Sequence, residues 1–159
     1  MRKDSRGFSL IELLIVVAII LIIAAIAIPN LLRSRIAANQ ASAVGSLRTL
    51  NTANITYAST YNTGYAPDLA SLGPGAGGAP SATAAGLVDS VLAGGVKSGY
   101  GFTYTPGTAT AGRIDVYTIN ANPTTPGTTG TNYYFTDQSG VIRQNSSAVA
   151  GATDSPIAG

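Results

Sequence analysis

The sequence predicts an α+β fold in which one long N-terminal helix packs against a small antiparallel sheet of about four strands. Three observations support this prediction. An apolar run of 20 residues without a charge extends from Leu13 to Leu32. Apolar residues then continue at helical spacing as far as Tyr61. Beyond residue 100, short runs alternate between large apolar and small or polar residues, as half-buried strands do.

The first element is a short basic leader followed by an apolar helix. Three basic residues and Asp4 precede Gly7, Phe8 opens the apolar stretch, and Glu12 is the only charge within it. A helix rises about 1.5 Å per residue, so the run from Leu13 to Leu32 reaches about 30 Å. That length matches the hydrocarbon core of a membrane.

Three interpretations of this segment are open. A plain single-pass anchor explains the apolar run alone. A secretory signal peptide explains the basic start and the A-x-A-like pattern Ala25-Ile26-Ala27, although its apolar region normally has about 7–15 residues and seldom begins with an acidic residue. The third interpretation takes Gly7, Phe8 and Glu12 together as one motif.

That motif, with its leader and its span, closely resembles the N-terminal signal of type IV pilins and of the pseudopilins of type II secretion. The resemblance covers Arg6 to about Leu32. It implies that a prepilin peptidase cuts between Gly7 and Phe8 on the cytoplasmic side, and that Phe8 is then N-methylated. It also implies an inner-membrane precursor with a cytoplasmic N-terminus and a pilin-like fold. Charge alone leaves the orientation undecided, because basic residues also follow the span at positions 33 and 35.

Glu12 needs a physical reason, because a carboxylate at the middle of a membrane helix costs about 2.5–3.5 kcal/mol and less near the end. One interpretation is a carboxylate that reaches to the membrane surface. The other is assembly: after the cut, the amine of Phe8 is a positive charge at the same depth, and Glu12 of one subunit can pair with the amine of its neighbour. The resemblance supports this assembly role.

Pro29 lies near the far end of the apolar run and should kink or loosen the helix, because it lacks a backbone N–H and clashes with the carbonyl of Ala25. The resemblance places a proline at this position of pilin helices, where the preceding turns can unwind in the filament. Leu21 stands where many relatives have a glycine, which puts that unwinding in doubt.

The helix is expected to continue as an amphipathic half over 33–61 and to end at the sequence Tyr61-Asn-Thr-Gly64. Its apolar positions should face the sheet: Ile36, Ala43, Leu47, Leu50, Tyr57 and Tyr61. The polar residues between them, Asn51 and Asn54 included, are expected on the other face. At about 1.5 Å per residue, a helix over 8–61 is roughly 80 Å long, which suits the shaft of a filament.

A loop-rich connection is expected over 62–99, with short helical pieces at 65–72 and 87–92 and a low-complexity loop at 73–86. Strands are predicted at 100–105, 113–119, 133–136 and 141–143, with a hairpin turn at 137–140. In 113–119, Ile114 and Val116 share one face while Tyr117 and Ile119 share the other. The tail after Asn145 is expected to be ordered only by neighbouring subunits.

The expected organisation therefore has six segments: a leader over 1–7, a membrane-spanning or filament-core half-helix over 8–32, an amphipathic half-helix over 33–61, the connection over 62–99, the sheet over 100–145 and a C-terminal tail over 146–159.

Composition excludes several functions. Without cysteine or histidine, the chain forms no disulfide and lacks the commonest general base. Removal of residues 1–7 takes away three of the nine basic and one of the seven acidic residues, which leaves six of each and no case for nucleic-acid binding. No catalytic constellation is present, so we expect neither an enzyme nor a cofactor.

Two kinds of site are candidates beyond the apolar run. Asp115 and Asp137 are candidate calcium ligands, by similarity to the C-terminal region of the major pseudopilin, although Asp137 also fits ordinary turn chemistry. Asn54 and Asn145 each begin an Asn-x-Ser/Thr pattern, the acceptor for N-glycosylation.

The resemblance implies a structural subunit that leaves the inner membrane and joins an extracellular helical homopolymer. Its partners would be copies of itself, the prepilin peptidase and methylase, the pilus or type II secretion machinery, and membrane lipid before assembly. A major pseudopilin is the alternative within the family. A membrane-anchored periplasmic binding domain that never polymerises is the alternative outside it.

Overall fold

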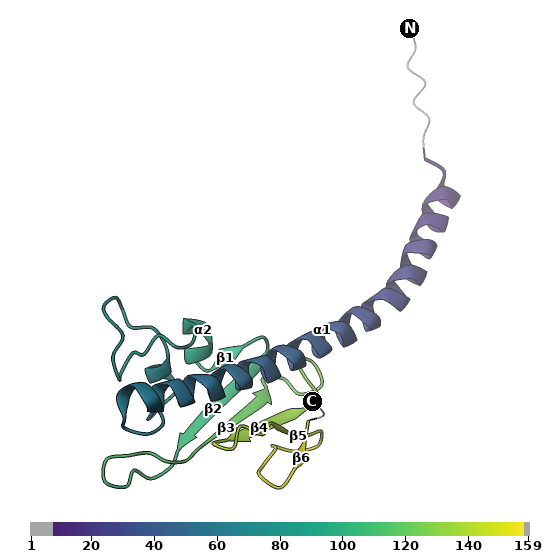
Figure 1. Ribbon diagram of the computed structural model, residues 1–159. Helices are drawn as coiled ribbons and strands as arrows, with labels where there is room; N and C mark the ends of the chain where they lie inside the picture. The colour runs from purple at the N-terminus through teal and green to yellow at the C-terminus, as the bar shows by residue number, and fades with distance from the viewer. Residues whose placement is uncertain (1–7, 158–159) are drawn as a thin grey trace. The chain divides into compact units, whose positions relative to one another are not determined.

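The computed structural model describes residues 8–157 (Figure 1). The leader, which includes Gly7, and residues 158–159 lie outside the described residues. The chain forms two compact units, Met1–Arg35 and Ile36–Gly159, and we call the second the head unit. Helix α1, Leu10–Tyr61, contributes to both units. The predicted α+β architecture is confirmed, with a sheet larger than expected.

The first unit contains the apolar half of α1. Its large apolar side chains between Phe8 and Leu32 are exposed on every side of the helix, by 44% at Val17 and up to 77% at Phe8. Among the described residues, α1 is the one helix that is both long enough and apolar enough to cross a membrane. The helix runs through Pro29 without interruption, and the loosening of the helix there stays a prediction.

The second half of α1 is amphipathic, as its spacing predicts. Its buried residues recur at three- and four-residue steps: Ala43, Ser46, Leu47, Leu50, Asn51, Ala53, Asn54 and Tyr57. Placing Asn51 and Asn54 on the polar face was wrong. They lie on the buried face, because the sheet and the connection supply hydrogen-bond partners for their amides.

The helix ends at Tyr61, as predicted. Asn62 adopts the left-handed conformation with φ of 57°, and Gly64 follows with φ of 79°. A side chain at Gly64 would clash with the backbone of Ile114. That close approach allows two backbone hydrogen bonds, Tyr65 N–H to Ile114 O at 2.8 Å and Ile114 N–H to Thr63 O at 3.1 Å. Gly64 therefore lets the chain turn from α1 back along the head unit.

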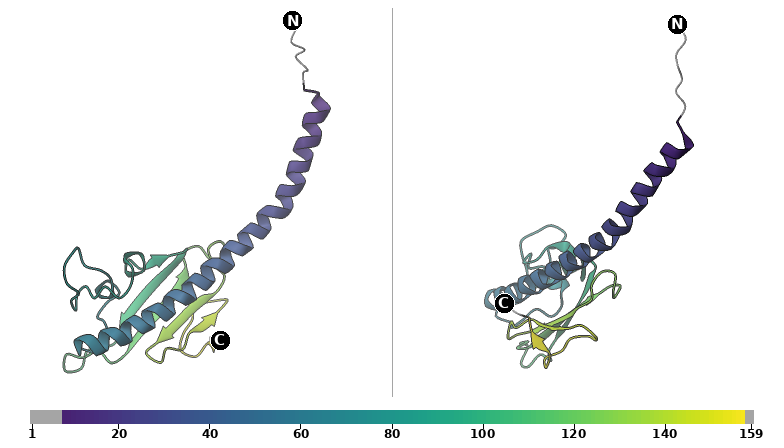
Figure 2. Two further views of the ribbon diagram at one scale, coloured as in Figure 1. Left: turned by 45° about the horizontal axis from the view of Figure 1, so that its top comes forward. Right: turned by 90° about the vertical axis from the view of Figure 1, so that its right-hand side faces the viewer.

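The sheet is an antiparallel meander of six strands in the order β1-β2-β3-β4-β5-β6 (Figure 2). The strands are β1 Val96–Lys97, β2 Tyr100–Pro106, β3 Tyr117–Pro123, β4 Tyr133–Asp137, β5 Arg143–Asn145 and β6 Ser155–Pro156. The four predicted strands correspond to β2 through β5. The prediction missed β1 and β6, because each has only two residues and is defined by its partner strand rather than by a pattern of its own.

Two strand boundaries differ from the prediction. β3 was expected over 113–119 but begins at Tyr117, because Arg113 closes a tight turn with Thr110 through two backbone hydrogen bonds of 2.9 and 3.0 Å. It continues to Pro123, which lies opposite Tyr100 of β2. β5 was expected over 141–143 and instead covers Arg143–Asn145, opposite β4.

The tail was also predicted wrongly. Beyond Asn145 the chain returns as β6 and pairs with β5 inside the same subunit (Figure 1). Ile157 N–H then donates to Ile142 O at 2.9 Å. The C-terminal segment is therefore held by the head unit itself.

The core of the head unit lies between α1 and one face of the sheet. Alternate residues of β3 are buried, which is the period of a strand with one covered face. The sheet contributes buried side chains from three strands to this core: Tyr100, Phe102, Tyr117, Ile119, Ala121 and Tyr134. Leu47, Leu50 and Tyr57 of α1 pack against them.

The connection contains the two short helical pieces that were expected. The 3₁₀ helix η1, Ala70–Leu72, follows Asp68, whose Oδ1 accepts from Ser71 N–H at 2.7 Å. Helix α2, Ser90–Ala93, is capped by Asp89, whose Oδ1 accepts from Leu92 N–H at 2.9 Å. The Lys97 ammonium donates to Asp89 Oδ2 at 2.8 Å and lowers the pKa of that carboxyl.

Candidate processing and assembly site

The N-terminal end of α1 is organised by Ser9 and Glu12. The backbone N–H of Ser9 donates to Glu12 Oε2 at 2.9 Å, and Leu13 N–H donates to Ser9 O at 3.2 Å. A serine followed three residues later by a glutamate is the capping-box spacing, in which the glutamate reaches back to the first N–H of the helix. A negative charge is also favoured at a helix N-terminus by the helix dipole. Glu12 therefore stabilises the start of its own helix.

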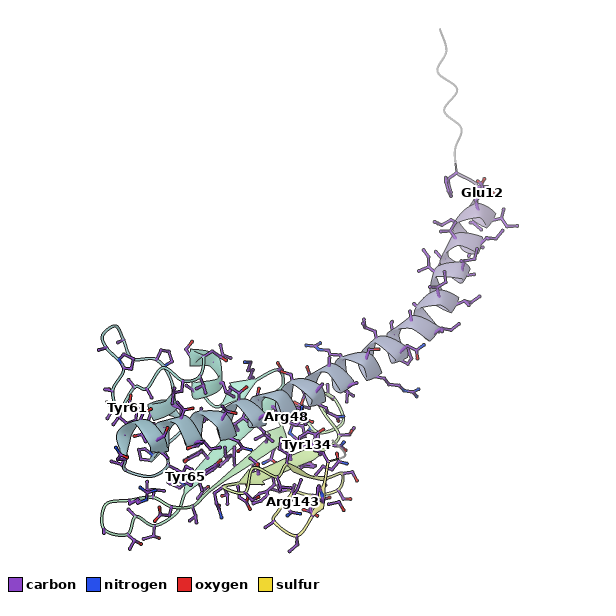
Figure 3. All side chains as sticks on the ribbon, viewed as in Figure 1. Glu12, Arg48, Tyr61, Tyr65, Tyr134 and Arg143 are labelled. Carbon is purple, nitrogen blue, oxygen red and sulfur yellow. The ribbon has the colours of Figure 1, made fainter. Side chains whose placement is uncertain are left out.

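Figure 3 shows Glu12 at the N-terminal end of α1, where apolar side chains surround it along the helix. Phe8 lies two residues before Leu10, where the helix begins, and is 77% exposed. The predicted cut after Gly7 falls outside the described residues. If the chain begins at Phe8, the new amine lies four residues from Glu12, or about 6 Å along a helix axis. Amine and carboxylate of one chain are thus offset by about one helical turn along the axis.

Residues 2–28 match the family model described as the prokaryotic N-terminal methylation motif. The N-terminal segment of the chain is therefore similar to that of proteins with this motif. The motif spans the leader, Phe8 and Glu12, so the residues that carried the resemblance are the ones recognised.

Two curated relatives are also similar to part of this chain. The type IV major pilin protein PilA of Myxococcus xanthus is 55% identical over 49 residues, which are 31% of this chain and 22% of the relative. The type IV wide pilus major component PilA4 of Thermus thermophilus is 62% identical over 37 residues, 23% of this chain and 28% of the relative. The matches thus cover less than a third of either relative. Type IV pilins are structural proteins, in agreement with the expectation that this chain is not an enzyme.

In the head unit, Asn54 joins α1 to the connection and the sheet. Its side chain is fully buried. Its Nδ2 donates to Leu50 O at 3.0 Å, and its Oδ1 accepts from Tyr104 O–H at 3.0 Å and from Ala66 N–H at 3.3 Å. The Tyr104 hydroxyl also lies 2.8 Å from Ala66 O. The proposed glycan at Asn54 is therefore incompatible with this fold, because a buried amide with three partners cannot carry a sugar.

Asn51 makes the equivalent connection one turn earlier. Its Nδ2 donates to Thr136 Oγ1 at 2.9 Å, and its Oδ1 accepts from the Tyr117 hydroxyl at 3.0 Å. Burial raises the pKa of Tyr117 and of Tyr104 above the usual value of a tyrosine. Both rings therefore act as neutral hydrogen-bond donors, and the two asparagines fix the position of the sheet on α1.

The other predicted sites have local partners. Asp115 pairs with Arg113, Oδ1 to Nε at 2.6 Å, with both side chains more than half exposed. Asp137 Oδ1 accepts from Ser139 N–H at 2.9 Å in the predicted turn, which ends at Gly140 with φ of 75°. Across residues 8–157, no group of three or more acidic, histidine or cysteine side chains is placed to hold a metal ion. Calcium binding at Asp115 and Asp137 stays a prediction.

The sequence interpretation missed Asp154. Its Oδ1 accepts from the Nδ2 of Asn145, the second glycosylation candidate, at 2.9 Å. Asn145 is half-buried in β5, and its Oδ1 accepts from Ser147 N–H at 2.9 Å. The nine-residue separation of Asn145 and Asp154 has no local pattern that would have indicated the contact. Glycosylation of Asn145 stays a prediction, and its amide has a structural role.

Proposed function

We propose that this chain is the precursor of the structural subunit of a type IV pilus-like filament. One observation carries the proposal: the apolar half of α1 is exposed on all sides, and nothing in the described chain covers it. Burying one leucine or isoleucine side chain is worth about 1.5–3 kcal/mol. A helix with this surface needs an apolar environment, which membrane lipid provides before assembly and other copies of the helix provide afterwards.

Lipid and filament differ in one respect that concerns Glu12. Lipid tails are as apolar as leucine, so exchanging lipid for neighbouring helices gives little hydrophobic gain. A specific polar contact is then needed to favour assembly and to set the register between subunits. Glu12 supplies the acceptor, and the amine of Phe8, released by cleavage after Gly7, supplies the donor. In this apolar environment an ion pair, in which both the amine and the carboxylate carry a charge, is stronger than the hydrogen bond from the neutral Ser9 N–H that it would replace.

The proposal assigns the remaining partners by similarity. The leader is recognised by a prepilin peptidase and methylase, the precursor stays in the inner membrane with its N-terminus in the cytoplasm, and an assembly machine adds the processed subunit to the filament. Both relatives are named as major pilus subunits, which favours an extracellular pilus over the pseudopilus of type II secretion.

Replacement of Glu12 tests the proposal. We expect Glu12→Ala to be cut after Gly7 and to remain in the membrane, with no filaments in the sheared surface fraction. Glu12→Gln should be equally defective, because it keeps the size and the hydrogen-bonding capacity but lacks the charge. Ser9→Ala is the matched control: it retains the backbone N–H and should assemble normally.

The alternatives give other results. A membrane-anchored binding domain that does not polymerise predicts that Glu12 is dispensable and that Gly7 stays attached. If the chain is a pseudopilin, it is cut after Gly7 and its assembly depends on Glu12, but the processed chain is found only in the membrane fraction. Normal filaments from Glu12→Ala would contradict the pairing.

A further inference from the structure

Two apolar residues are buried on the face of the sheet that points away from α1. Phe135 of β4 lies between Tyr134 and Thr136, whose side chains face α1, so its own side chain points to the opposite face. Phe135 is nevertheless only 7% exposed, and Ala150 of the C-terminal segment is 3% exposed. Both are buried apolar residues outside the main core.

The C-terminal segment covers this face. Asn120 of β3 lies directly opposite Phe135 in the sheet, on the same face. Its Nδ2 donates to Ala150 O at 2.8 Å. We call residues 146–157 the strap. It leaves β5, meets the outer face where Ala150 O accepts from Asn120, and returns as β6 beside β5 (Figure 1).

Asp154 holds the two ends of the strap together. Its Oδ1 accepts from Asn145 Nδ2 at 2.9 Å, where the strap begins, and its Oδ2 accepts from Gly151 N–H at 2.8 Å, within the strap. Its backbone carbonyl accepts from Arg143 Nη1 at 2.9 Å. One residue therefore joins β5, the crossing segment and the approach to β6. Figure 3 labels Arg143 on this side of the head unit.

The other attachments of the strap are short. β6 consists of Ser155 and Pro156, and a proline has no N–H to donate. Without cysteine, the chain cannot close this segment with a covalent bond. By contrast, seven consecutive residue pairs join β2 and β3, so the sheet has far more pairing to lose than the strap.

We propose that the strap covers Phe135 and is held in place by the hydrogen bonds of Asp154. We further propose that the strap opens while the sheet stays folded. Opening exposes Phe135 and Ala150. The inference does not depend on filament assembly, because all of its contacts lie within one head unit.

Hydrogen exchange of the full-length chain in detergent micelles, read by mass spectrometry, tests this proposal. Asp154→Ala should raise the exchange rate of strap amides at least about tenfold, because it removes two charge-assisted hydrogen bonds. Peptides of β3 should exchange as in the unmodified chain. Asn145→Ala removes one of the three donors and should give a smaller increase in strap peptides that begin after Ala148. The Ser147 and Ala148 N–H groups donate to Asn145 Oδ1 and would exchange faster for that reason alone.

Asp115→Ala is the matched control, because it removes an aspartate whose side-chain partner, Arg113, is not part of the strap; it should leave strap exchange unchanged. Elastase should cut Asp154→Ala first within Ala148-Val149-Ala150 and leave the rest of the head unit intact. If the exchange rates of the strap amides stay within twofold of the unmodified chain in both Asp154→Ala and Asn145→Ala, Asp154 does not hold the strap in place. Equal acceleration of β3 and the strap would overturn their independent opening, and if Asp154→Ala does not fold, Asn145→Ala decides by the same comparison.

Discussion

Asn54→Ala should destabilise the head unit by about 2–4 kcal/mol. The substitution removes the acceptor of the Ala66 N–H, and Ala66 is fully buried, so the donor is left without water. An unsatisfied buried donor costs about 1–3 kcal/mol. The cavity left by the amide adds about 1 kcal/mol. The Tyr104 hydroxyl keeps its second acceptor, Ala66 O at 2.8 Å, and adds little to the loss.

Urea unfolding of the full-length chain in detergent, followed by near-ultraviolet circular dichroism, measures this loss. All eight tyrosines lie between residues 57 and 134, so the tyrosine signal reports on the head unit and not on the apolar half of α1. Thr52→Ala is the control, because Thr52 is exposed on the same helix and donates only to Arg48 O; it should change stability by no more than about 0.5 kcal/mol. A similarly small effect of Asn54→Ala would refute the assigned role of the Asn54 hydrogen bonds.

Further predictions concern the buried tyrosines and two glycines. Because burial raises the pKa of Tyr104 and Tyr117 in the folded state, stability should be constant below the unfolded value near 10 and should fall above it. The fall amounts to at most about 1.4 kcal/mol per pH unit for each tyrosine, and urea midpoints that do not change between about pH 9 and pH 11 would contradict it. Gly45→Ala should stabilise α1 by about 0.5–1 kcal/mol, because nothing lies within 4 Å of the added Cβ. Gly64→Ala should cost more than about 1–2 kcal/mol, because its φ is 79° and the new Cβ meets the Ile114 carbonyl; equal thermal midpoints for the two alanine variants would show that reasoning to be wrong.

The long helix and the central strands could be predicted because their patterns are local. The three- and four-residue spacing of Leu47, Leu50 and Tyr57 is enough to identify a buried helix face. The limits of β3 could not be predicted in this way. Alternation in the sequence continues through 113–116, but backbone pairing with β2 begins only at Tyr117 and runs on through the unfavourable strand formers Asn122 and Pro123.

Polar residues show the other limit of sequence interpretation. An asparagine is usually exposed, and only the three-dimensional position of Tyr104 and Ala66 makes burial of Asn54 favourable. Asp154 and Asn145 meet through a loop that no short motif announces. The N-terminal motif is different: Gly7, Phe8 and Glu12 are recognisable from their order alone, whereas the partner proposed for Glu12 lies on another chain.

The N-terminus of the assembled protein tests the central claim most directly. Material sheared from the cell surface should be analysed by intact mass and by N-terminal sequencing. The account predicts a polymer of a 152-residue chain, the 159 residues without the first seven, that begins with N-methylated Phe8. A chain that still begins at Met1, or one that begins at Ile28 after cleavage by a signal peptidase, would contradict it.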